Sequence, residues 1–99
     1  MFSYVGNQSP NLLDIGNLNI YADDISAMFQ EASGIKATLN IYSTNPIYSN
    51  GNYGPIFKNA AINPNSLITV NYSRNTTNID DIIASKSENS NVVKGILLD

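Results

Sequence analysis

Residues 17–32 read Asn-Leu-Asn-Ile-Tyr-Ala-Asp-Asp-Ile-Ser-Ala-Met-Phe-Gln-Glu-Ala, and the predicted fold depends on the change of periodicity within them. Its first five residues, 17–21, alternate with a period of two, which is typical of a half-buried strand. The period then changes, and apolar residues recur at the spacing of one helical face, at Ile25, Met28, Phe29 and Ala32. The stretch therefore predicts a strand followed by an amphipathic helix.

The ends of this helix are also marked in the sequence. Asp23 and Asp24 come first, where the positive end of a helix dipole favours carboxylates, and Gly34 follows as a helix stop. We therefore expect the helix to lie between these residues.

Three further segments, all later in the sequence, have the pattern of strands: residues 36–43, 67–72 and 92–98. In the first of them, alternation places Ala37, Leu39 and Ile41 on the inner face. Each strand would contribute to one sheet.

A second helix is predicted after the strand at 67–72. Thr77 and Asp80 have the spacing of a capping box, with Asp in place of Glu. An apolar face follows at Ile79, Ile82 and Ile83. An alternative reading makes residues 81–87 and 92–98 a hairpin.

Together these elements predict a single-domain α+β fold. Its order is strand, helix, strand, hairpin, strand, helix, strand, which suits a two-layer sandwich of two helices on one face of a four- to five-stranded sheet. The domain would span residues 15–99, and residues 1–14 would form an N-terminal arm. A mostly-β sandwich is the alternative.

A short sequence echo accompanies this pattern. Leu18-Asn19-Ile20-Tyr21 recurs as Leu39-Asn40-Ile41-Tyr42. The echo is consistent with duplication, although a composition rich in Asn and Ile makes short matches common.

The composition excludes many kinds of chemistry. The 99 residues contain no Cys and no His, which removes thiolate and imidazole zinc sites, thiol nucleophiles and the Ser-His-Asp triad. Five basic residues, scattered singly along the chain, make no cationic stripe, so we expect no nucleic-acid partner. We expect no enzymatic activity and no cofactor.

We also expect no membrane association, because the sequence shows neither a signal peptide nor an apolar run of about 18 residues. Localisation stays open, between a host cytoplasm and a virion for a phage-encoded chain.

The polar composition indicates a protein that binds other proteins. There are 16 Asn, 11 Ser, 5 Thr and 2 Gln against 13% charged residues, a balance that we associate with virion, fibre and secreted bacterial proteins. A chain this short without disulfides gains stability most readily from a partner or from self-association. We therefore expect an interaction or assembly protein of phage or viral type, either a particle component or a small inhibitor of a host protein.

The predicted contact surface spans residues 42–57. Its Tyr and Asn side chains combine rigid contact area with adaptable hydrogen bonding. Asn50-Gly51 is the preferred pair for a type I′ hairpin, which would place Tyr48 opposite Tyr53 as a cross-strand aromatic pair. The candidate binding residues are Tyr42, Asn45, Tyr48, Asn50, Asn52 and Tyr53.

Two other functions remain open at this point. One is a small-ligand or carbohydrate-binding module that uses tyrosine stacking and asparagine hydrogen bonds. A weaker alternative is a metal-dependent hydrolase whose acidic pairs, Asp23/Asp24 and Asp80/Asp81, would have to meet in space.

Overall fold

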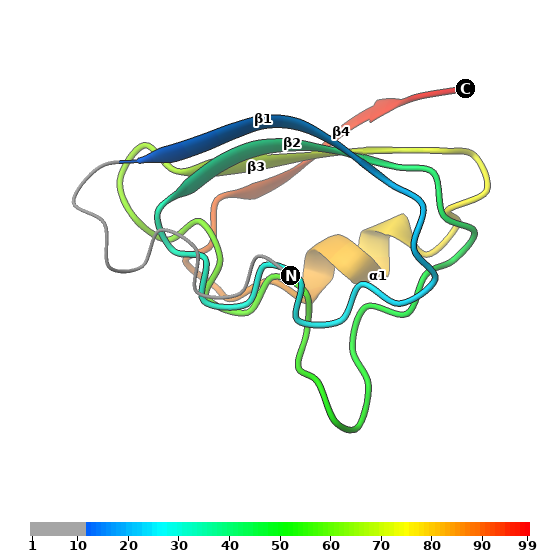
Figure 1. Cartoon of the computed structure of the whole chain (residues 1–99), viewed down its shortest axis with the longest axis horizontal. Helices are drawn as coiled ribbons and strands as arrows, with labels where there is room; N and C mark the ends of the chain where they lie inside the picture. Colours follow the sequence, from blue (N-terminus) through cyan, green and yellow to red (C-terminus); the bar gives the residue numbers. More distant parts are fainter. Residues whose placement is uncertain (1–11) are drawn as a thin grey trace.

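The strands follow one another across the sheet in the order of the sequence (Figure 1). The computed structural model describes residues 12–99. In this part of the chain the strands are β1 (Leu13–Ile20), β2 (Ile35–Ile41), β3 (Leu67–Tyr72) and β4 (Val92–Leu97). All neighbouring pairs are parallel, so each connection carries the chain back to the same end of the sheet. The backbone therefore coils, and each coil contacts its sequence neighbours as in a short solenoid.

The strand register stacks apolar side chains in rows on one face of the sheet, which we call the inner face. Leu18, Leu39 and Val70 form one such row. The predicted inner positions of β2 are confirmed, since Ala37, Leu39 and Ile41 are all buried. The core therefore lies beneath the sheet, between the strands and the segments that connect them.

The predicted helix at residues 23–33 is wrong, although its apolar face is buried as expected. Ala27 and Glu31 have φ angles of 58° and 61°, in the left-handed region that an α-helix excludes. The segment is a series of turns, in which Met28 donates to Ile25 and Ala32 donates to Phe29. Turns with bonds three residues apart bury the same spacing of side chains as a helix does, which explains the false prediction.

These turns stack on the turns of the next coil and form what we call the turn layer. The N–H groups of Ala27 and Phe29 donate to the carbonyls of Gly54 and Ile56, at 2.9 and 3.0 Å. The Phe29 and Phe57 rings stack across the same boundary, with centroids 6.2 Å apart. Backbone bonds between coils thus replace the bonds of the predicted helix.

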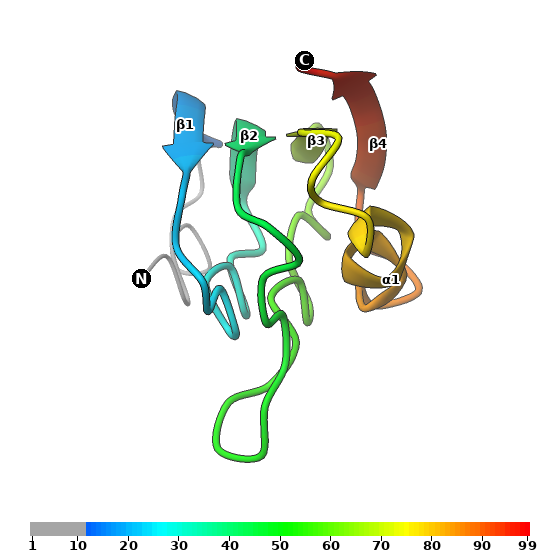
Figure 2. The same ribbon diagram turned by 90° about the vertical axis from the view of Figure 1, so that its right-hand side faces the viewer.

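One helix occurs in residues 12–99 where two were predicted. α1 (Ile79–Ala84) lies beneath the β4 side of the sheet, with Ile79 and Ile82 buried (Figure 2). The predicted capping box is wrong, because the N-cap residue is Asn78 and it makes no side-chain capping bond. The alternative hairpin of residues 81–87 and 92–98 is also wrong, because α1 occupies the first segment and β4 pairs parallel to β3.

The result is a two-layer molecule with the sheet on one side and the turn layer and α1 on the other (Figures 1 and 2). The predicted arm, residues 1–14, lies mostly outside the described residues, and Leu13 and Asp14 belong to β1. In the described residues, α1 is too short to cross a membrane.

Candidate functional site

The sheet face opposite the core, which we call the outer face, has neither helix nor turn layer on it within residues 12–99 (Figure 2). It is covered by the alternate side chains of the strands and of the residues that follow them. The pairings place on it Asn17, Asn19, Thr38, Asn40, Thr69 and Asn71, with Tyr21 and Tyr42 beyond the strand ends.

Three asparagines cross the outer face as a ladder of side-chain hydrogen bonds. Asn40 Nδ2 donates to Asn19 Oδ1 at 3.0 Å, and Asn71 Nδ2 donates to Asn40 Oδ1 at 3.0 Å. The parallel register makes this possible, because it places all three residues at one level of neighbouring strands. All donors point the same way, towards β1, so the ladder has a direction.

The ladder ends at β4 in a backbone group. Asn71 Oδ1 accepts the N–H of Ile96 at 2.9 Å. Residue 95 is glycine, and a Cβ there would overlap Asn71 Oδ1. Gly95 therefore makes room for the last amide of the ladder.

Two tyrosines stack beside the ladder, one residue beyond the ends of β1 and β2. The rings of Tyr21 and Tyr42 are 5.1 Å apart between centroids and 10° from parallel. Tyr21 remains 69% exposed, whereas Tyr42 is 36% exposed. The stack therefore leaves Tyr21, on the edge coil, as the more accessible ring.

The predicted hairpin is present, but the pair of residues that closes its loop differs from the prediction. Asn50 and Tyr53 exchange backbone hydrogen bonds of 3.0 and 3.2 Å, which makes Gly51 and Asn52 the two loop residues. The predicted type I′ turn at Asn50-Gly51 is wrong, because neither residue has a positive φ. The predicted Tyr48–Tyr53 pair is wrong as well, since Tyr53 faces Asn50.

The candidate asparagines at 45 and 50 have structural roles. Asn45 Oδ1 accepts the backbone N–H groups of Thr77 and Asn78 at 2.7 and 3.2 Å, so it satisfies donors just before α1. Asn50 Oδ1 accepts the N–H groups of Asn52 and Tyr53, which holds the hairpin closed. The side-chain oxygens of both residues are therefore occupied by hydrogen bonds within the chain.

The remaining candidates lie at three separate places. Tyr48 packs against the core, and Tyr42 joins the outer face. Asn52 and Tyr53 are exposed at the hairpin tip, which projects away from the sheet (Figure 2). The structure thus does not bring the six candidates together.

Sequence reasoning missed four residues of the ladder and the tyrosine stack: Asn19, Asn40, Asn71 and Tyr21. Three of them, Asn19, Asn40 and Tyr21, lie in the tetrapeptide that recurs at residues 18–21 and 39–42, and this repeat was the available signal. Because equivalent residues of successive coils lie side by side, the repeated Asn and Tyr become neighbours.

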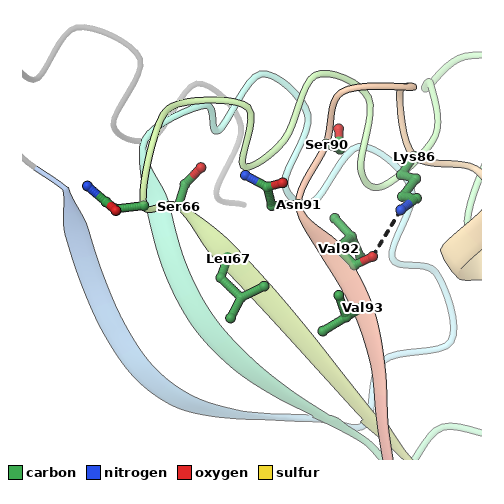
Figure 3. A pocket seen from close by; sticks show the side chains of 8 residues that line it. Ser66, Leu67, Lys86, Ser90, Asn91, Val92 and Val93 are labelled. Carbon is green, nitrogen blue, oxygen red and sulfur yellow. Dashed lines mark hydrogen bonds between the residues drawn. The ribbon is translucent and has the colours of Figure 1, made fainter.

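A groove of about 380 Å³ lies between the starts of β3 and β4 (Figure 3). Its lining includes Leu67, Val93 and Lys86, whose Nζ donates to the Val92 carbonyl at 3.1 Å. Ser90 also lines the groove, and its buried Oγ has no hydrogen-bond partner in the described part of the chain.

The acidic residues make no metal cluster. Within residues 12–99, no three acidic side chains come close enough to hold a metal ion. Hydrogen bonds from the hydroxyl and N–H of Ser26, and from Asn50, hold the pKa of Asp24 below its usual value. Asp80 accepts from Lys94 Nζ at 3.0 Å, and this bond raises the pKa of Lys94.

Comparison with known proteins identifies no relative. No protein-family model matches the chain, and neither a curated protein nor a solved structure resembles it significantly.

Proposed function

We propose that this chain is a non-enzymatic protein-interaction module whose contact surface is the outer face of the sheet. The observation that supports the proposal is the ordered row of amides and stacked rings on a face that no described segment covers. The proposal moves the predicted contact from the hairpin at 42–57 to the sheet, with Tyr42 common to both.

The outer face has the properties that lower the cost of binding. Its asparagines are fixed by one another, and its two tyrosines are fixed by stacking, so little side-chain entropy remains to be lost. Tyrosine supplies a large contact area with few rotatable bonds. The ladder row contains no charged side chain, so a partner need not desolvate an ion there.

Two forms of the proposal differ in the partner. In one the module assembles with copies of itself, as in a particle, and in the other it blocks a surface of a foreign protein. The mass of a covalent adduct distinguishes them.

A photo-crosslinking amino acid placed at single positions tests the proposal in the cells that naturally make the chain. We expect protein adducts from position 42 on the outer face and none from position 88, an exposed loop position that serves as the control. Adducts from position 53 alone would indicate that the partner binds the hairpin tip and not the outer face. Equal adducts from all three positions, or none from position 42, would contradict the proposal.

The groove beside Lys86 supports a second candidate function, small-ligand binding. Its volume of about 380 Å³ falls within the range of small-molecule pockets, and the unpartnered Ser90 hydroxyl is the specific observation. A ligand that binds the folded state raises the melting temperature. A thermal-shift screen of sugars and small anions, repeated with Lys86→Met, tests this candidate, and no shift at millimolar concentration would reject it.

A further inference from the structure

Three rows of side chains that cross the sheet terminate at the free edge of β1. Within residues 12–99, β1 pairs with β2 on one side and has no strand on the other. Parallel strands with free backbone groups accept an added strand when side chains fix its register. Each of the three rows supplies such a constraint.

The first row is the asparagine ladder. Asn19 Oδ1 accepts from Asn40, and because the oxygen and nitrogen of an amide diverge, Asn19 Nδ2 points away from Asn40 and is the open end of the ladder. Asn19 is exposed. The missing component is an acceptor at the level of Asn19, and the carbonyl oxygen of another asparagine would repeat the spacing already present.

The second row is the tyrosine stack. Tyr42 covers one face of the Tyr21 ring, yet Tyr21 is still 69% exposed. Another aromatic ring at this level would extend the stack by one member.

The third row lies on the inner face. Beside β1 there is a hollow of about 110 Å³, lined mainly by apolar groups of Leu18, Ile20, Ala22 and Met28. It marks the end of the rows that Leu39 and Ile41 continue on the other side. An apolar side chain on an added strand would enter it.

We propose that the β1 edge binds a parallel strand of a partner protein with the pattern apolar–Asn–apolar–aromatic. The inference rests on the proposed interaction function and gives the partner its chemistry. The pattern is the one that residues 39–42 already present to β1 from its other side: Leu39 pairs with Leu18, Asn40 with Asn19 and Ile41 with Ile20.

A second copy of this chain fits the edge less well. Within residues 12–99 the other edge strand is β4, and its six residues, 92–97, include no asparagine, so β4 of a second copy cannot supply the pattern. Its own β1 could pair only in the antiparallel sense in a twofold dimer, and if Asn19 then faced its copy, Tyr21 would face Asn17. A copy can therefore continue one row but not all three.

A peptide copied from residues 36–43 of this chain, labelled with a fluorophore, tests the proposal by anisotropy with the whole chain. We expect saturable binding that weakens about tenfold when the peptide asparagine becomes leucine, and about tenfold when its tyrosine becomes alanine, because the first change removes one hydrogen bond and the second removes one ring stack. In the protein, Asn19→Ala and Tyr21→Ala should weaken binding likewise. Ile96→Ala, on the opposite edge, is the matched control and should leave it unchanged.

Three outcomes would overturn the proposal. They are equal binding of a scrambled peptide, no binding at millimolar peptide, and a concentration-dependent dimer that Tyr21→Ala disrupts, which would make a second copy the occupant. Circular dichroism of each variant separates lost binding from lost folding. Adducts at position 42 without peptide binding would leave the proposed function intact and remove only this inference.

Discussion

Asn71 and Gly95 are matched across β3 and β4: the amide oxygen of Asn71 lies where a side chain on residue 95 would begin, and it accepts the N–H of Ile96. The match connects the register of β4 to the last amide of the asparagine ladder. The stability changes caused by substitutions at Asn71 and at Gly95 should therefore depend on each other.

Gly95→Ala should destabilise the chain by about 1–3 kcal/mol, the usual cost of forcing extra volume into an occupied space. Chemical denaturation measures the loss. Gly51→Ala is the control, because a Cβ there meets nothing within 4 Å. The double variant Asn71→Ala/Gly95→Ala should lose less than the sum of its single changes, and simple additivity would contradict the match.

Asn40→Ala should cost about 1–2 kcal/mol, because it removes two side-chain hydrogen bonds, an exposed one with Asn19 and a partly buried one with Asn71. Thermal or urea unfolding provides the measurement. Asn52→Ala, at the exposed hairpin tip, should change stability by less than about 0.5 kcal/mol. Equal losses from both changes would argue against an energetically important ladder.

Ala27→Gly should stabilise the chain by up to about 1 kcal/mol, because Ala27 has a φ of 58° and glycine adopts this region without strain. In a helix the same change would destabilise by about 1 kcal/mol, so the sign of the effect tests the turn layer directly. The control is Ala32→Gly, which lies in the same segment without a positive φ and is fully buried. It should be destabilising.

Ionisation of Asp24 should make part of the stability of the fold depend on pH. Its hydrogen bonds with Ser26 and Asn50 lower its pKa in the folded chain below 3.8, its usual value. The bonds therefore stabilise the fold above pH 3.8, and this contribution is lost as the pH falls below 3.8 towards the folded value. Unfolding midpoints of the chain and of Asp24→Asn should differ at pH 7, and the difference should shrink as the pH falls below 3.8. A difference that is constant across this range would contradict the assignment.

The strands could be predicted because their signal is local. Alternation within residues 36–41 needs no knowledge of the rest of the chain, and Ala37, Leu39 and Ile41 are buried as it requires. Which strands pair with each other depends on residues far apart in the sequence. Alternation within one segment therefore could not predict that the strands lie in the sheet in their sequence order.

The false helix has the opposite origin. The spacing of Ile25, Met28, Phe29 and Ala32 is common to a helix and to successive turns. What selects turns here is a set of backbone acceptors on the next coil, Gly54 and Ile56 among them. A local pattern carries no information about those partners.

The candidate site shows the same limit. The hairpin predicted at Asn50-Gly51 would pair Tyr48 with Tyr53, whereas the observed pair, Tyr21 and Tyr42, joins different coils. The repeated tetrapeptide at residues 18–21 and 39–42 carried that information, but only a parallel pairing of the two segments turns it into contacts. Asn71, which follows Val70, has no such echo and needed the structure.

Side-chain amide exchange, measured by nuclear magnetic resonance at Asn19, Asn40 and Asn71, tests whether the asparagine ladder is ordered and open at β1. In the free chain we expect slow exchange for the Asn40 and Asn71 amides, which donate within the ladder, and fast exchange for Asn19 Nδ2 at its open end. Addition of the peptide of residues 36–43 should slow exchange at Asn19 and leave the other two unchanged. Fast exchange at Asn40 and Asn71 in the free chain, or no change at Asn19 with bound peptide, would contradict the account.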